Sequence, residues 1–126
     1  MPQSDRAPKV ILIVDDEESI LKLMKYTLEC EGFAVITEKT GQGAVEIAQN
    51  TKLTAVLLDL GLPDLDGFEV LKKIKQAKLS LPVIMVTGMH LEAEARKAFE
   101  LGAWDYVTKP IDFNYLKNIL LMQSEG

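Results

Sequence analysis

Short apolar runs and longer amphipathic stretches alternate along this chain of 126 residues. The first run spans residues 10–14, which are all valine, isoleucine or leucine, and a helical spacing of apolar residues follows it as far as Gly32. A run that is apolar on both alternating faces predicts a strand buried on both sides, whereas apolar residues three and four positions apart predict an amphipathic helix. The chain therefore opens with a strand and a helix.

The same pair of patterns recurs along the rest of the chain. Further apolar runs predict extended segments at residues 33–37, 55–58, 83–86 and 106–108. A helical stripe follows each run, and Asp66, with Glu69 three residues later, predicts the N-cap of the third helix. Buried strands that are separated by helices form a parallel sheet with helices on both sides. The sequence therefore predicts a doubly wound α/β domain with five strands and five helices.

Polar residues with distinct chemistry follow four of these strands. They are Asp15, Asp16, Asp59, Thr87 and Lys109. Because ligands of such sheets bind outside the carboxyl ends of the strands, we expect these side chains to converge on one rim. Three carboxylates that meet there repel one another, and a divalent cation such as Mg²⁺, with oxygen ligands, relieves that repulsion. A carboxylate can also act as a nucleophile that forms an aspartyl phosphate.

Each of these residues has a simpler interpretation when it is taken alone. Acidic residues at 15–18 suit the first turn of a helix, where the helix dipole favours negative charge. Asp59 suits a solvated strand end, and Thr87 suits a turn. The agreement of four strand ends is what favours a common site for phosphoryl transfer, in which a metal ion and Lys109 neutralise charge.

With these motifs in place, the chain resembles the receiver domain of two-component response regulators over roughly residues 9 to 122. The order and spacing of four segments carry this resemblance: Val14–Glu17, Asp59–Gly67, Val86–Gly88 and Tyr106–Pro110. The resemblance implies a flavodoxin-like fold, whose five-stranded parallel sheet has the order 2-1-3-4-5. It also implies a receiver domain over residues 9–126, and we expect the polar residues 1–8 to form a disordered leader.

The resemblance implies a role for each residue of the rim. Asp59 is the phospho-acceptor, and Asp15 and Asp16 hold Mg²⁺ together with Asp59 and the backbone carbonyl of Gly61. The phosphoryl donor is a phosphohistidine of a sensor histidine kinase or of a phosphotransfer protein. The domain then catalyses only its own phosphorylation and dephosphorylation, and it is not an enzyme for other substrates.

The resemblance also implies a conformational switch. Thr87 bonds to the phosphoryl group, Lys109 pairs with its charge, and Tyr106 is the aromatic switch residue. The bond between Lys109 and Pro110 is expected to be cis. The switched surface comprises the fourth helix, the fifth strand and the fifth helix, and it is a possible homodimer surface.

Composition narrows the classes of partner. The net charge of −5 and the pI near 4.9 argue against direct binding of nucleic acid. The single cysteine, Cys30, excludes an intramolecular disulfide, and the apolar runs are too short to span a membrane. The sequence therefore predicts a cytoplasmic domain without a membrane segment.

Two alternatives remain open on the sequence alone. One is a receiver-like interaction module that is never phosphorylated. The other is a phosphatase with an aspartate nucleophile, although such an enzyme usually places its nucleophile after the first strand, at Asp15 or Asp16 rather than at Asp59.

Overall fold

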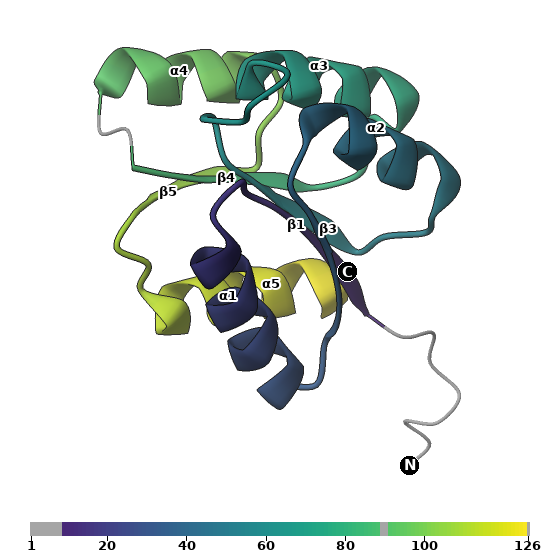
Figure 1. Cartoon of the computed structure of the whole chain (residues 1–126), viewed down its shortest axis with the longest axis vertical. Coiled ribbons are helices and arrows are strands. Elements are labelled where there is room, and N and C mark those ends of the chain that lie inside the picture. The colour runs from purple at the N-terminus through teal and green to yellow at the C-terminus, as the bar shows by residue number, and fades with distance from the viewer. Residues whose placement is uncertain (1–8, 89–90, 126) are drawn as a thin grey trace.

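The computed structural model describes residues 9–88 and 91–125, which form a sheet covered by helices on both faces (Figure 1). The leader expected at residues 1–8 lies outside the described residues. Strands and helices alternate strictly along the chain. They are β1 (Val10–Val14), α1 (Glu18–Cys30), β2 (Ala34–Glu38), α2 (Gly41–Asn50), β3 (Ala55–Leu58), α3 (Gly67–Ala77), β4 (Val83–Thr87), α4 (Glu92–Glu100), β5 (Asp105–Thr108) and α5 (Phe113–Glu125).

The five strands form one parallel sheet in the order β2-β1-β3-β4-β5, which confirms the predicted fold. Pairing with neighbours lengthens two of the predicted segments, at β4 and β5, and shifts the segment predicted at residues 33–37 by one residue, to Ala34–Glu38. Val14 pairs with Glu38, Ile84 pairs with Asp105, and Thr87 pairs with Thr108. The ladder of backbone hydrogen bonds thus extends each strand to polar residues that the apolar pattern did not include.

The sheet separates two clusters of buried apolar side chains. On one side α2, α3 and α4 cover residues such as Leu12 and Val14, and on the other side α1 and α5 cover Ile11 and Ile13 (Figure 1). This division follows from the alternation of side chains along a strand. Because both faces are covered, the polar groups that follow the strands gather at the carboxyl rim of the sheet.

Several helix ends have identifiable caps. The Asp66 side chain accepts a hydrogen bond of 2.8 Å from the amide of Phe68, which confirms the predicted N-cap of α3. Gly32 and Gly102 follow α1 and α4 with φ angles of 96° and 102°, a region that favours glycine. Within the described residues, no helix has the length and apolar character needed to cross a membrane.

Candidate functional site

Three aspartates that are distant in sequence meet at the carboxyl rim of the sheet. Asp15 follows β1 and Asp59 follows β3, and the amide of Asp59 donates to the carbonyl of Val14 over 3.0 Å. Three carboxylate oxygens lie within 4.8 Å of one another, one from each of Asp15, Asp16 and Asp59. Asp15 and Asp59 are buried, with 2% and 8% of each residue exposed, whereas Asp16 is exposed. The cluster therefore has a buried base and an open outer side.

Lys109 supplies a positive charge inside this cluster. Its Nζ lies 2.7 Å from Oδ2 of Asp15, 3.1 Å from Oδ2 of Asp59 and 3.5 Å from Oε1 of Glu17. Burial alone would lower the pKa of Lys109, but its hydrogen bonds to Asp15 and Asp59 outweigh burial and leave that pKa raised. Lys109 is therefore held as a charged ammonium between the carboxylates.

The backbone places Lys109 at the site. Its amide donates to the carbonyl of Thr87 over 2.8 Å, which continues the pairing of β4 with β5. The Lys109–Pro110 peptide bond is cis, the isomer that the sequence led us to expect. The ammonium group thus reaches the aspartates from the end of a neighbouring strand.

The Asp15 carboxyl is less easily ionised than an ordinary aspartate. Burial is the main reason why its pKa is raised, the hydrogen bond from Lys109 acts in the opposite direction, and the nearby charge of Asp59 raises it further. The ionised carboxylate is therefore less favourable in the folded protein than in the unfolded chain. A further cation at the cluster would reduce the free-energy cost of keeping the buried Asp15 carboxyl ionised.

Asp15→Asn is accordingly expected to stabilise the metal-free protein at pH 7. Because the folded-state pKa of Asp15 is raised, the folded state binds more protons than the unfolded state, and stability falls as the pH rises through that pKa. The substitution removes this penalty, and Lys109 keeps its contact with Asp59. We expect a gain of about 1 kcal/mol in the free energy of unfolding, a common size for a single substitution.

Urea unfolding in the presence of a chelator at pH 7 and pH 4 measures this effect. The gain should shrink at pH 4, where the wild-type carboxyl is closer to protonated. Asp16→Asn is the control, because the Asp16 side chain is exposed. A loss of stability for Asp15→Asn at pH 7 would contradict the prediction.

The segment between β3 and α3, residues 59–66, is called the acceptor loop below. The amide of Gly61 donates to Oδ1 of Asp59 over 3.3 Å, and Gly61 forms an antiparallel bridge with Asp66. The amide of Gly67 donates to the carbonyl of Leu60 over 3.2 Å. The acceptor loop therefore turns back on itself directly beside Asp59.

Thr87 and Tyr106 belong to β4 and β5, the two strands that follow β3 in the sheet. Thr87 ends β4 and is buried, and Tyr106 on β5 pairs with Met85 and packs against the core beneath α2, α3 and α4. The pKa of the Tyr106 hydroxyl is raised, first by burial and then by the charges of Glu94 and Asp59. Tyr106 thus lies under the electrostatic influence of both α4 and the aspartate cluster.

The structure brings the sequence-predicted residues to one rim and adds two contacts that the sequence did not suggest. Asp15, Asp16, Asp59 and Lys109 form one cluster, Gly61 lies next to it, and Thr87 ends an adjacent strand. Glu17 also approaches Lys109, and Asp64 of the acceptor loop bonds to the start of α2. Neither contact leaves a signal in sequence spacing, because each joins residues from separate elements.

Comparison with known families agrees with this geometry. The sequence model of the response regulator receiver domain matches residues 11–121. This chain belongs to the response regulator receiver family.

Individual relatives agree with the family assignment. The receiver domain is 43% identical over 120 residues to the alkaline phosphatase synthesis transcriptional regulatory protein PhoP of Bacillus subtilis (strain 168), covering 93% of this chain and 50% of that protein. The chain spans half or less of the length of the first curated relatives that it matches. The similarity therefore concerns one domain of these regulators.

Two solved structures resemble the receiver domain closely. A CheY-like receiver domain from Methanospirillum hungatei JF-1 has a TM-score of 0.87 and 32% identity, with 94% of this chain and 98% of that chain covered. The receiver domain of the sensor histidine kinase PA1611 from Pseudomonas aeruginosa PAO1, solved with a magnesium ion coordinated in its active site cleft, has a TM-score of 0.86 and 27% identity, with coverages of 95% and 100%. Both confirm the flavodoxin-like fold.

Proposed function

We propose that this receiver domain works in the cytoplasm and accepts a phosphoryl group on Asp59 from a phosphohistidine of a sensor histidine kinase or phosphotransfer protein. The observation that carries the proposal is the position of the Asp59 carboxylate. It is buried at the base of the aspartate cluster, and Lys109 lies 3.1 Å from its Oδ2. The Asp59 carboxylate is thus held beside a positive charge that can neutralise the oxygens of an incoming phosphoryl group, as phosphoryl transfer requires.

The residues of the cluster fit a magnesium ion. Its three carboxylates offer hard oxygen ligands within 4.8 Å of one another, and the exposed Asp16 leaves the outer side open to water and phosphate. We propose that Asp15, Asp16, Asp59 and the backbone carbonyl of Gly61 hold Mg²⁺. When bound, the ion neutralises charge on the phosphoryl oxygens. The PA1611 receiver domain, with its coordinated magnesium, supports this assignment.

The chain's own residues perform the remaining steps. A carboxylate oxygen of Asp59 attacks the phosphorus atom, and the bond from phosphorus to the donor histidine nitrogen breaks. The electron pair of that bond stays on the imidazole nitrogen, which takes up a proton from water and so leaves as neutral histidine. Lys109 and the Thr87 hydroxyl bond to the phosphoryl oxygens. Hydrolysis by water later regenerates the Asp59 carboxylate and inorganic phosphate, so that the domain acts only on itself.

Phosphorylation with a small donor tests this proposal. The purified protein is treated with acetyl phosphate and Mg²⁺, and its peptides are mapped by mass spectrometry. We expect one phosphoryl group, carried by the peptide that contains Asp59, and none when a chelator removes the metal. A phosphoryl group on another residue would overturn the assignment, and an unmodified protein would favour an interaction module.

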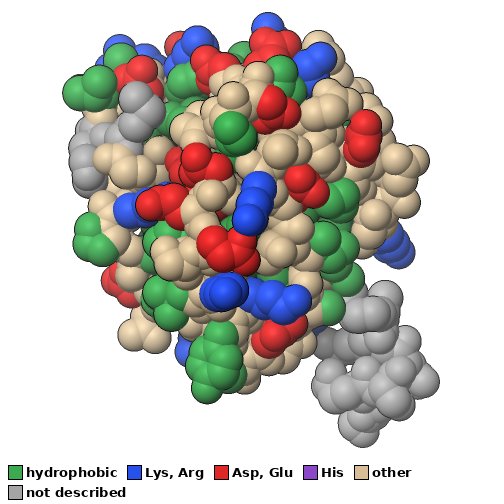
Figure 2. Space-filling view, viewed as in Figure 1, with side chains coloured by type: hydrophobic (Ala, Val, Ile, Leu, Met, Phe, Trp, Pro, Cys, Tyr) green, Lys and Arg blue, Asp and Glu red, His purple; other side chains and the backbone are tan. Residues whose placement is uncertain are grey.

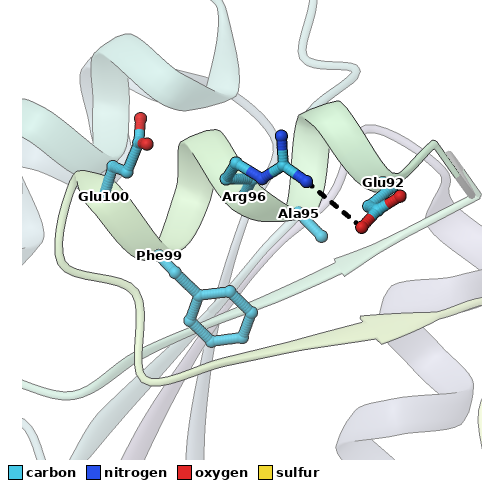
Figure 3. Close-up of a pocket in the computed structure, with 5 residues that line it drawn as sticks. All are labelled: Glu92, Ala95, Arg96, Phe99 and Glu100. Carbon is cyan, nitrogen blue, oxygen red and sulfur yellow. Dashed lines mark hydrogen bonds and ion pairs between the residues drawn. The ribbon is translucent and has the colours of Figure 1, made fainter.

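We further propose that phosphorylation changes a surface made of α4, β5 and α5, which binds a partner or a second copy of the domain. Large apolar side chains are exposed on or directly beside these elements, including Phe99 on α4, Tyr115 on α5 and Trp104 just before β5. Phe99 also lines a shallow pocket on α4, together with Glu92, Ala95, Arg96 and Glu100 (Figure 3). Exposed aromatic side chains beside an arginine are typical of protein-binding surfaces.

We also propose that this domain does not itself bind nucleic acid or a membrane. The chain carries a net charge of −5. On the face seen in Figure 2, acidic and basic side chains are interspersed. A protein partner fits such a mixed surface better than a polyanion does.

The single tryptophan offers a test of the proposed switch. Trp104 is 52% exposed, directly precedes β5 and lies two residues before Tyr106, and its amide donates to the carbonyl of Val83 on the neighbouring strand. If Tyr106 changes its position on phosphorylation, Trp104 loses or gains a neighbour. Addition of beryllofluoride with Mg²⁺ is therefore expected to change the tryptophan fluorescence, and Tyr106→Ala should diminish that change. An equal response without Tyr106 would contradict the coupling.

A further inference from the structure

Asp64 connects the acceptor loop to a helix that precedes it in the chain. Its Oδ1 accepts a hydrogen bond of 2.7 Å from the amide of Gly41, and its Oδ2 accepts one of 3.0 Å from the amide of Gln42. Both amides belong to the first turn of α2, where backbone donors have no partner within the helix. The Asp64 side chain thus binds two residues that precede it by 23 and 22 positions in the sequence.

This contact adds to the ordinary cap of α2 and does not replace it. The side chain of Thr40, the N-cap residue, accepts from the amide of Gly43 over 3.1 Å. Asp64 accepts from the amides of Gly41 and Gln42, to which the Thr40 side chain does not bond. Those two hydrogen bonds, first from Gln42 and then from Gly41, lower the pKa of the Asp64 carboxyl, so that it stays charged at a lower pH than an ordinary aspartate does.

Close packing accompanies the hydrogen bonds. A Cβ atom at Gly41 would lie 2.6 Å from Cγ2 of Val70 and 3.0 Å from Cβ of Leu65. Leu65, the neighbour of Asp64, packs against the core on that side of the sheet. The start of α2 therefore fits against the acceptor loop and α3 without intervening space.

The other end of the same loop lies at the phosphoryl acceptor. Gly61 bonds to Asp59 and bridges to Asp66, whereas Asp64 lies at the outer part of the turn between them. A Cβ atom at Gly61 would have no neighbour within 4 Å, so packing around Gly61 contributes little to holding the loop in place. The position of Gly61 therefore depends on its own backbone bonds and on how the rest of the acceptor loop is anchored, by buried Leu60, by Leu65 and by Asp64.

We infer that Asp64 is a positioning residue for phosphorylation: by tying the acceptor loop to the first turn of α2, it fixes the backbone of Gly61 beside Asp59. This inference rests on the proposed function, in which the carbonyl of Gly61 holds Mg²⁺. Asp64 itself touches neither the metal nor the phosphoryl group. Its effect should therefore appear in metal affinity and disappear when the metal is saturating.

Asp64→Ala is expected to weaken Mg²⁺ binding about tenfold, the lower end of what is typical when a group that orients a metal ligand is removed. Titration calorimetry with magnesium chloride measures the affinity. The rate of phosphorylation by acetyl phosphate should fall at low Mg²⁺ and return to the wild-type rate at saturating Mg²⁺. Asp64→Asn keeps one acceptor oxygen for the helix amides and should recover part of the lost affinity.

Thr40→Ala is the matched control. It removes a hydrogen bond from the same end of the same helix, but Thr40 has no bond to the acceptor loop. The control should lower the urea midpoint of unfolding while Mg²⁺ affinity stays unchanged. Amide hydrogen exchange without metal gives a second comparison: residues 61–66 should exchange faster in Asp64→Ala than in Thr40→Ala.

The outcomes distinguish this inference from the proposed function. Weaker Mg²⁺ binding and faster exchange in Asp64→Ala alone would support the positioning role. Wild-type affinity in Asp64→Ala, or an equal loss of affinity in Thr40→Ala, would overturn it and leave the proposed function intact. A wild-type protein that neither binds Mg²⁺ nor becomes phosphorylated would overturn the proposed function, and this inference with it.

Discussion

Asp59→Asn is expected to abolish phosphoryl uptake from acetyl phosphate completely. The amide nitrogen and oxygen of asparagine share their electrons and are poor nucleophiles, whereas the carboxylate attacks phosphorus directly. The size of the side chain hardly changes, and Lys109 keeps its 2.7 Å contact with Asp15. Intact-protein mass spectrometry after treatment with acetyl phosphate and Mg²⁺ measures the result, and a residual phosphorylated fraction would contradict it.

Asp66→Asn is the matched control for this experiment. Asp66 lies in the same acceptor loop, but its carboxylate caps α3 through the amide of Phe68. Asparagine is also a good N-cap, so the helix start should be preserved. Phosphorylation of this variant should match the wild type. If both variants lost phosphorylation, disruption of the loop rather than loss of the nucleophile would explain the result.

Gly67→Ala is expected to lower the free energy of unfolding by about 3 kcal/mol, the upper range for overpacking of a rigid site. Helix propensity alone predicts the opposite, because alanine stabilises a helix by about 1 kcal/mol relative to glycine. Here a Cβ atom would lie 2.5 Å from Cα of Leu60 and 2.7 Å from the carbonyl oxygen of Asp59. Both neighbours are backbone atoms, so relief of the clash would displace the backbone of Asp59, the residue that we propose accepts the phosphoryl group.

Urea unfolding of Gly67→Ala and Gly61→Ala separates crowding from backbone flexibility. Gly61 lies within the acceptor loop and Gly67 directly follows it, and each substitution adds one methyl group, but a Cβ atom at Gly61 meets nothing within 4 Å. Gly61→Ala should therefore change stability by less than about 0.5 kcal/mol, as for an ordinary surface substitution. Wild-type stability in Gly67→Ala would show that the backbone yields easily at this point.

Much of the fold was predictable because its strands are buried on both faces. The runs at residues 10–14 and 55–58 contain only apolar residues, and the structure places both in the interior of the sheet. The strand ends at Glu38 and Asp105 were not predicted, because polar residues there take part in backbone pairing without burying an apolar side chain. Apolar patterns report burial, whereas strand length depends on hydrogen bonds to neighbours.

The aspartate cluster was predictable for a related reason. Parallel strands end at one rim, so that Asp15 and Asp59 had to be neighbours once β1 and β3 were adjacent. The contacts of Glu17 with Lys109 and of Asp64 with Gly41 were not predictable, because they depend on how loops turn after the strands end. Loop geometry is set by local packing, which leaves no periodic trace in the sequence.

The two separate apolar clusters have a consequence for how sequences of this kind can diverge. Each strand residue faces one helical layer only: Leu12 and Met85 face α2, α3 and α4, whereas Ile11 and Ile84 face α1 and α5. Residues that share no contacts contribute to stability independently. A change of side-chain volume in one cluster can therefore be compensated by a second substitution within that cluster, without any change in the other. Related domains are free to remodel the helices on one side of the sheet while the other side, and the rim between them, keeps its shape.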